Sequence, residues 1–177
     1  MQPLRRPRPL KLPTRSAREQ AERKALWNEA RSVKSATFFT IGYSGRTAEQ
    51  FVRLLTDAAV NCLVDIRYTP LSMYKPDFSR TNFQRILKEA GIEYLHVQQL
   101  GVPRDIRARA ITAGSRDVIW EWYDQHVVEQ YLQKNVRELV NLNQRIALMC
   151  VEADPTECHR HLLFQALEDN GLQGYDL

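Results

Sequence analysis

The segment 145-RIALMCVEADPTECHRHLLFQAL-167 decides the fold that the sequence predicts. Its apolar run, residues 146–151, is typical of a buried strand and breaks into a short acidic loop. Pro155 fits the first position of a helix, Asp154 can cap that helix, and Glu157 stands where a capping box places a carboxylate. A strand, a tight loop and a capped helix form half of a β-α-β unit, so this segment indicates a parallel sheet.

The rest of the chain alternates predicted strands and helices in the same way. Strands are expected at 37–41, 61–66, 92–97 and 175–177, and helices at 47–58, 82–90 and 117–143. This order predicts an α/β domain, with a mainly parallel sheet flanked by helices on both faces. Ligand sites in such sheets form beyond the carboxyl ends of the strands. The loops expected at that edge are 42–46, 67–80, 98–116 and 152–157.

The basic character of the chain is confined to its N-terminal part. Residues 1–35 carry ten Lys or Arg and three Glu, a net charge of +7, whereas the remainder has a net charge of −3. Four prolines in residues 1–16 favour disorder, and residues 17–34 could form a helix. We therefore expect a single domain at 36–177, preceded by a disordered or helical basic extension at 1–35.

Composition limits the environment of the protein. No apolar run exceeds about six residues, which argues against a membrane span. Three cysteines, an odd number, argue against a disulfide framework and for a cytoplasmic location. Cys62 and Cys150 fall within apolar strands and are expected in the core. No sequence motif indicates a cofactor.

Polar residues follow the first two predicted strands. Asp65 and Arg67 end the second strand on the same face, where they either form an ion pair that fixes the loop or contact a substrate. The turn that contains Gly42, Tyr43 and Ser44 either cradles a phosphate through its backbone N–H groups or is an ordinary strand-to-helix turn.

The run Cys158-His159-Arg160 falls near the start of the last predicted helix. On a helical wheel, Cys158 is partly exposed, so it is either a nucleophile with a favoured thiolate or a small residue near the cap. His159 turns toward the sheet, and Arg160 either clamps an anion or pairs with Asp65 or Glu152. Because Cys158 and His159 diverge on the wheel and no Cys-x-x-Cys pair exists, we expect no metal site.

Four blocks of sequence resemble the DUF488 family over about residues 37–170. They are 40-TIGYSG-45, 63-LVDIRYTPLS-72, 91-GIEYLHVQQLG-101 and 149-MCVEADPTECHR-160, in the family's order; Val102 replaces the second glycine that usually follows the third block. The resemblance implies an α/β domain without an established activity. Its pattern residues are Gly42, Ser44, Asp65, Arg67, Pro70, Ser72, His96, Leu100, Gly101, Glu152, Cys158, His159 and Arg160.

Our leading hypothesis is a small enzyme that acts on a small anionic or phosphate-bearing ligand. Asp65, Glu152, Cys158 and His159 are the catalytic candidates, and Gly42, Tyr43, Ser44, Arg67, Ser72, His96 and Arg160 are the substrate-binding ones. The second hypothesis is a non-catalytic module that binds nucleic acid weakly and without specificity through the basic extension. The third is a redox sensor based on Cys158, for which only Cys150 is near enough in sequence to act as a partner.

Overall fold

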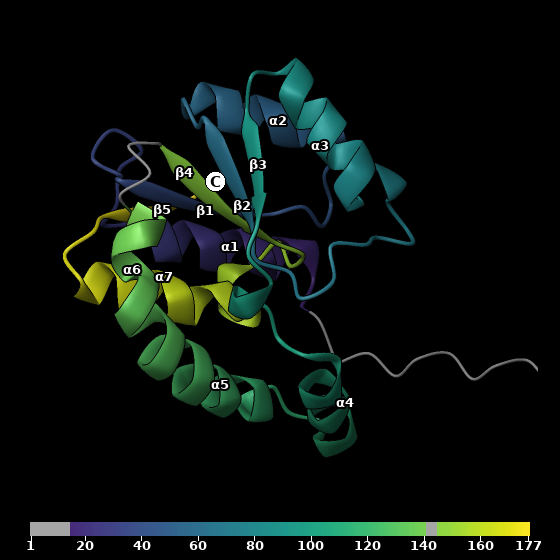
Figure 1. Cartoon of the computed structure of the whole chain (residues 1–177), viewed down its shortest axis with the longest axis vertical. Coiled ribbons are helices and arrows are strands. Elements are labelled where there is room, and N and C mark those ends of the chain that lie inside the picture. The colour runs from purple at the N-terminus through teal and green to yellow at the C-terminus, as the bar shows by residue number, and fades with distance from the viewer. Residues whose placement is uncertain (1–14, 141–144) are drawn as a thin grey trace, which may run out of the picture.

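A computed structural model describes residues 15–140 and 145–177 of the chain and contains a five-stranded parallel sheet (Figure 1). Its strands are β1 (Phe38–Gly42), β2 (Cys62–Asp65), β3 (Glu93–His96), β4 (Ile146–Cys150) and β5 (Gly174–Asp176). They lie in the order β3-β2-β4-β1-β5, and each pairs with its neighbours in parallel. The predicted fold class, including the last short strand, is confirmed.

Helices cover both faces of the sheet (Figure 1). The helices α2 (Ala48–Asp57) and α3 (Arg80–Glu89) cover one face. The other face is covered by α5 (Asp117–Tyr123), the π-helical segment η3 (Asp124–Leu132), α6 (Gln133–Val140) and α7 (Arg160–Asp169). The alternation of side chains along β1 divides the core: Phe38 packs on the α7 side and Phe39 on the α2 side.

One predicted loop contains a helix that the sequence analysis missed. The segment 98–116, expected to be irregular, holds the short 3₁₀ helix η2 (Gln98–Leu100) and the helix α4 (Arg104–Ala113). Ile106 and Ala110, four residues apart, form the buried side of α4. The helix ends at Gly114, whose φ of 67° lies in the left-handed region that glycine tolerates.

The segment after β4 also differs from the prediction. Pro155 opens only the 3₁₀ turn η4 (Pro155–Glu157), which Asp154 caps by accepting from the backbone N–H of Thr156. The predicted capping box is absent, since the Glu157 carboxylate binds Arg15 instead. Cys158 then adopts an extended conformation, with φ −122° and ψ 142°. Because α7 begins only at Arg160, the helical wheel did not apply to Cys158.

The N-terminal helix α1 (Ala17–Asn28) confirms the helix expected within residues 17–34 and is joined to the domain by polar contacts. Arg23 pairs with Asp154, Lys24 with Asp176, and Arg31, just after the helix, with Glu168. The prolines expected to be disordered lie within residues 1–14, outside the described residues. None of the helices in the described part of the chain combines the length and apolar character that a bilayer span requires.

Candidate functional site

Asp65 and Arg67 form a buried ion pair at the carboxyl end of β2. Arg67 donates from Nε to Asp65 Oδ1 at 2.8 Å and from Nη2 to Oδ2 at 2.6 Å, a bidentate arrangement. The hydroxyl of Tyr94, on the neighbouring strand β3, donates to Oδ2 at 2.6 Å. Asp65 is fully buried and Arg67 is 2% exposed. The ion pair that the sequence analysis considered is confirmed, and it fixes the direction of the Arg67 side chain.

Arg67 keeps one hydrogen-bonding group unused. Its Nη1 is buried and meets no hydrogen-bond acceptor among the described residues. Its guanidinium carbon lies 5.3 Å from the centre of the Tyr43 ring, which in turn stacks on Phe78. Burial lowers the pKa of Arg67, but the hydrogen bonds and charge of Asp65 outweigh this and keep that pKa above its ordinary value. Arg67 is therefore a permanent cation with a spare donor.

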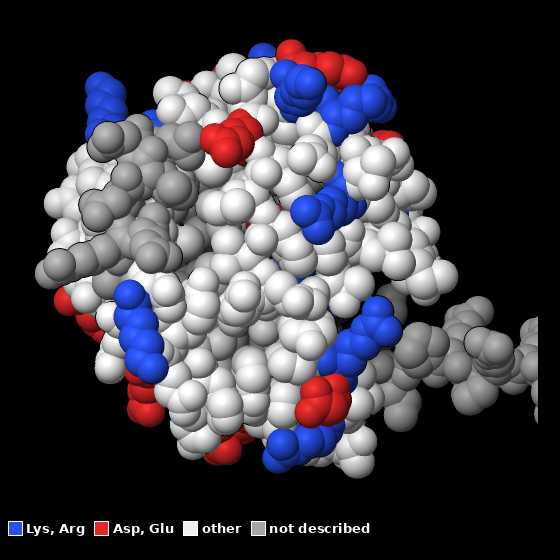
Figure 2. Space-filling model, viewed as in Figure 1, with Lys and Arg blue, Asp and Glu red and all other residues white. Residues whose placement is uncertain are grey.

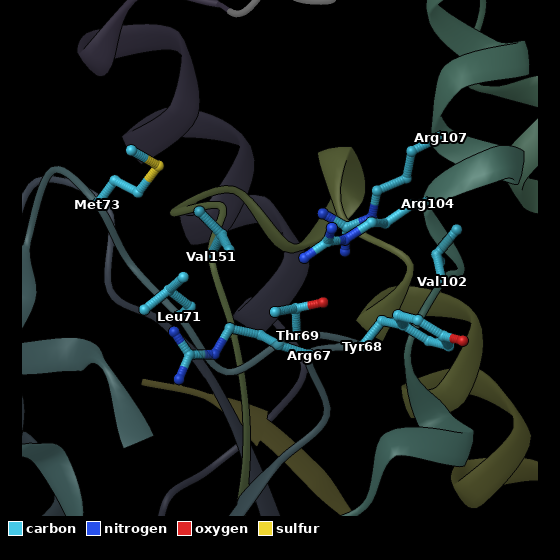
Figure 3. Close-up of a pocket in the computed structure, with 9 residues that line it drawn as sticks. All are labelled: Arg67, Tyr68, Thr69, Leu71, Met73, Val102, Arg104, Arg107 and Val151. Atoms are coloured by element: carbon cyan, nitrogen blue, oxygen red, sulfur yellow. The ribbon is translucent and has the colours of Figure 1, made fainter. Parts of the chain in front are cut away.

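A cavity of about 260 Å³ lies beside Arg67 at this edge of the sheet. We call it the arginine pocket because Arg67, Arg104 and Arg107 all line it. Figure 3 shows Arg104 and Arg107 extending from α4 toward the loop that carries Tyr68 and Thr69. Tyr68 and Thr69 also line the pocket, and the other lining residues are apolar: Leu71, Met73, Val102 and Val151. The pocket thus combines the guanidinium groups of Arg104 and Arg107 with an apolar wall, and the buried Arg67 lies beside them.

Arg160 lies outside the lining of this pocket and is fully buried. Its Nε donates to Asp176 Oδ1 at 3.2 Å, its Nη1 to the carbonyl of Glu152, and its Nη2 to the carbonyl of Ala153 at 2.9 Å. Every guanidinium nitrogen therefore has a partner within the protein. The carboxylate that pairs with Arg160 is Asp176 on β5. The sequence had suggested Asp65 or Glu152 instead. The structure thus separates Arg160 from Arg67.

Three other predicted residues gather behind the pocket wall around Cys150, the last residue of β4. The Cys150 sulfur lies 3.7 Å from Glu152 Oε2 and 3.9 Å from each ring nitrogen of His159. The Cys158 sulfur lies 4.0 Å from His159 Nδ1. Cys150, Cys158 and His159 are buried, so the expected exposure of Cys158 is wrong, as is its expected divergence from His159. The buried positions of Cys62, Cys150 and His159 are confirmed.

Burial changes the ionisation of this group. It raises the pKa of Cys158 well above the ordinary thiol value, and Cys150 raises it further. The Cys158 thiolate expected at a helix N-terminus is therefore disfavoured, and the thiol form is favoured. Burial also raises the pKa of Glu152, but the charges of His159 and Arg107 contribute to a net value below the ordinary one. Glu152 is thus a carboxylate beside the Cys150 thiol.

The predicted phosphate cradle after β1 has other roles. The backbone N–H groups of Tyr43 and Ser44 donate to the carbonyls of Cys150 and Val151, which leaves few donors for an anion. Gly42 allows close approach of the neighbouring loop, because a Cβ there would lie 1.7 Å from the carbonyl oxygen of Glu152. Ser44 lines a second cavity beside Lys24 and Arg46, apart from the arginine pocket.

The two residues that only the family resemblance suggested support the loops of the site. His96 Nε2 lies 2.8 Å from the backbone carbonyl of Arg67. Ser72 accepts from the backbone N–H of Lys75, and its own N–H donates to the Ser79 hydroxyl at 3.1 Å. Both contacts are structural and hold the segment between β2 and α3.

Of the residues that line the pocket, sequence reasoning named only Arg67 as a candidate site residue, and it missed Arg104 and Arg107 because it treated 98–116 as a loop. A signal was present: Arg104 and Arg107 are three residues apart, which places them on one face of a helix. Tyr94, which holds Asp65 from the adjacent strand, could not be assigned without the register that pairs Asp65 with His96.

Comparison with known proteins gives one match. A family model described as "Domain of unknown function DUF488" matches residues 47–167, more than half of the chain. No curated protein and no solved structure matches the chain.

Proposed function

The chain belongs to the DUF488 family, and we propose that it is a small enzyme whose arginine pocket binds a small phosphate-bearing ligand. One observation carries this proposal: three arginines from two separate segments line the same pocket. One of them, Arg67, has a buried Nη1 that meets no hydrogen-bond acceptor among the described residues. Arg104 and Arg107 form no ion pair with any other described residue, so their charge is available to a ligand. Guanidinium groups match the geometry of phosphate oxygens.

The apolar wall of the pocket favours a ligand that carries an apolar group in addition to its phosphate. Leu71 and Met73, which line the pocket, are 61% and 84% exposed. Apolar groups that surround a few charged ones are the usual lining of a small-molecule site. A nucleotide combines a phosphate with a flat, largely apolar base, so it fits this division of the pocket. We therefore place a nucleotide or a related aromatic phosphate first among the candidate substrates.

Among the predicted catalytic residues, Glu152 is the best placed for acid–base work in this proposal. Asp65 is fully buried and engaged by both Arg67 and Tyr94, so it serves to orient Arg67. Cys158 is also buried and is not among the residues that line the pocket. Glu152 does not line the pocket either, but unlike Asp65 and Cys158 it is only partly buried, and its neighbour Val151 forms part of the pocket wall.

Calorimetric titration of the full chain with phenyl phosphate tests the proposal. We expect the double variant Arg104→Ala/Arg107→Ala to bind at least about tenfold more weakly, because each lost charge-assisted hydrogen bond is worth roughly 1.5–3 kcal/mol. Arg109→Ala is the matched control, since Arg109 is exposed on the same helix and is not among the pocket-lining residues. Equal affinities for the two variants would contradict the proposal.

The enzymatic part needs a separate measurement. Incubation of the chain with a mixture of nucleotides and other phosphate esters, followed by mass spectrometry, should reveal one that is converted. Conversion should fail with Glu152→Gln while that variant still binds phenyl phosphate. If the chain binds phosphate esters but converts none of them, the protein is a phosphate-binding protein and the enzymatic part of the proposal is contradicted.

The nucleic-acid hypothesis gains less support. In α1 and its flanks, Arg15, Arg23 and Arg31 pair with carboxylates of the domain. Figure 2 shows Lys and Arg scattered among other residues on the visible face, without a continuous basic surface. Replacing Arg5, Arg6, Arg8 and Lys11 by Ala in the full chain tests the alternative. If the extension binds nucleic acid, this variant should lose the salt-dependent binding of single-stranded DNA and keep its affinity for phenyl phosphate.

A further inference from the structure

Two cysteines and a histidine from three consecutive pieces of the fold meet in the core behind the arginine pocket. Cys150 ends β4, Cys158 follows η4, and His159 directly precedes α7. One ligand atom from each of these residues lies within 4.8 Å of the other two. We call these three residues the Cys-His cluster. All three side chains are buried, with exposures of 1%, 1% and 4%.

We propose that the Cys-His cluster binds a thiophilic divalent cation of the zinc class. Two sulfurs and an imidazole nitrogen are the donor types that such cations select over magnesium or calcium. The proposal concerns a second site, apart from the arginine pocket, and does not depend on the function proposed above.

The distances between the ligand atoms fit a tetrahedral site. With zinc–sulfur distances of about 2.3 Å and zinc–nitrogen distances of about 2.0 Å, neighbouring ligand atoms lie roughly 3.5–3.8 Å apart. The sulfurs of Cys150 and Cys158 lie 3.9 and 4.0 Å from the ring of His159. A rotation of the His159 ring that points one nitrogen at the sulfurs, with movements of a few tenths of an ångström, would therefore bring these donors to a common centre.

Glu152 completes the coordination in this proposal, and in the cation-bound protein it then serves the cation in place of the acid–base role proposed above. Its Oε2 lies 3.7 Å from the Cys150 sulfur, so a small rotation of its side chain would bring a carboxylate oxygen to the cation. Binding releases the proton of each thiol to solvent, and two thiolates balance the charge of a divalent cation. With the Glu152 carboxylate as a further ligand, the site carries a net charge of about −1. The backbone carbonyls of Glu152 and Ala153 are already held by Arg160, which keeps the loop close to the cluster.

A cation here would join the end of β4 to the start of α7 and so fix the loop between them. That loop carries Val151, in the wall of the arginine pocket, and Glu152. The same two sulfurs could instead form a disulfide, and the three side chains could simply be packed core residues. These two alternatives predict no binding of a cation and serve as the contradicting outcomes of the test.

The test is reconstitution of the full chain with Co²⁺, which binds like zinc and reports its ligands in its absorption spectrum. The protein is purified with a chelator and a reductant, freed of both, and titrated with Co²⁺ under argon. We expect one equivalent to bind, with thiolate-to-cobalt charge-transfer bands and the intense visible bands of tetrahedral coordination. Competition with Zn²⁺ should abolish both sets of bands.

Variants of single ligands assign the site. Cys150→Ser, Cys158→Ser and His159→Ala should each weaken Co²⁺ binding by more than about a hundredfold, the upper end of losses for residues that only support a ligand. Cys62→Ser is the matched control, because Cys62 is a buried cysteine on β2 outside the cluster. It should bind Co²⁺ as the parent does, with unchanged bands.

The spectrum of the parent protein decides the matter even if the ligand variants fail to fold. Charge-transfer bands from two thiolates support the proposal. The proposal is overturned if the reduced, folded chain binds no Co²⁺ even when Co²⁺ is present in excess, or if Cys158→Ser binds Co²⁺ as tightly as the parent. It is also overturned if the purified chain holds a Cys150–Cys158 disulfide and binds no Co²⁺ after that disulfide is reduced.

Discussion

Arg67 and Arg160 both form a buried ion pair with an aspartate at the carboxyl edge of the sheet, but the protein uses their donors differently. Arg160 is fully enclosed, and each of its three nitrogens donates to Asp176 or to a carbonyl of the loop after β4. Arg67 binds Asp65 through two nitrogens, faces a cavity, and keeps Nη1 without a partner among the described residues.

In our proposal, this difference separates a structural arginine from one that can bind a ligand. A buried arginine with all its donors paired has no capacity left for an anion. A buried arginine with an unpaired donor beside a cavity is stabilised when an anion arrives, because an unsatisfied buried donor costs roughly 1–3 kcal/mol. In the sequence, each arginine has an acidic residue two or three positions before it. Only the complete set of partners distinguishes them.

The largest expected effect is on stability, at Arg160. Arg160→Ala leaves two buried backbone carbonyls without their donor and removes one partner of Asp176, which keeps Lys24 and Thr40, so we expect the free energy of unfolding to fall by about 3 kcal/mol. Urea denaturation at neutral pH measures this change. Arg160→Lys keeps the charge beside Asp176 and should lose less. If Arg160→Ala lost under about 1 kcal/mol, the structural role of this arginine would be contradicted.

The next effect concerns the response of Arg67 to ligand. At a phenyl phosphate concentration ten times its Kd, the free energy of unfolding of the parent should rise by about 1.4 kcal/mol. Arg67→Met should lose most of this increment, whatever the stability of the variant without ligand. Arg160→Lys, as the control, should keep it. Thermal unfolding of each protein with and without phenyl phosphate measures this ligand-dependent gain in stability. If Arg67→Met gains as much as the parent, Arg67 does not bind the ligand and the proposed difference between the two arginines is contradicted.

The smallest effect is expected at Tyr94, which supports Asp65 from β3. Tyr94→Phe removes the hydrogen bond to Asp65 Oδ2, which Arg67 still holds, so the loss should be about 1 kcal/mol. Burial and then the charge of Asp65 raise the pKa of the Tyr94 phenol. A raised folded-state pKa means that stability is complete below the unfolded phenol's pKa, about 10, and falls as pH rises above it.

The pH dependence provides the check on Tyr94. The parent should lose stability more steeply than Tyr94→Phe when urea denaturation is repeated from pH 9 to roughly pH 11, because only the parent keeps this phenol protonated when folded. Parallel pH profiles for the two proteins would show that Tyr94 is not coupled to Asp65.

Much of the site's position was predictable, and much of its composition was not. The order of strands and helices was enough to place Asp65, Arg67 and Glu152 at the carboxyl edge. The cost of burying either one alone made a pairing of Asp65 with Arg67 one of the two alternatives that the sequence offered, the other being contact with a substrate. By contrast, the partner of Arg160 is Asp176, which lies 16 residues away on β5. That pairing depends on β5 lying beside β1, which no local pattern reveals.

Cys158 shows why local reasoning failed closer to the site. A helical wheel assumes continuous helix, and the turn η4 breaks that assumption before Cys158. The extended conformation of one residue then brings Cys158 back toward His159, so that side chains expected to diverge meet in the core. The missed helix α4 had a similar consequence, since a segment taken as irregular supplies two of the three arginines of the pocket.

The most direct test of the central claim is a crystal structure of the full chain grown with tungstate, an analogue of phosphate that anomalous scattering locates without ambiguity. Our account predicts one tungstate in the arginine pocket, within hydrogen-bonding distance of Arg67 Nη1 and of Arg104 or Arg107, while Arg160 keeps its bonds to Asp176 and the two carbonyls. Tungstate bound at Arg160, or an arginine pocket left empty while tungstate binds elsewhere on the protein, would contradict it.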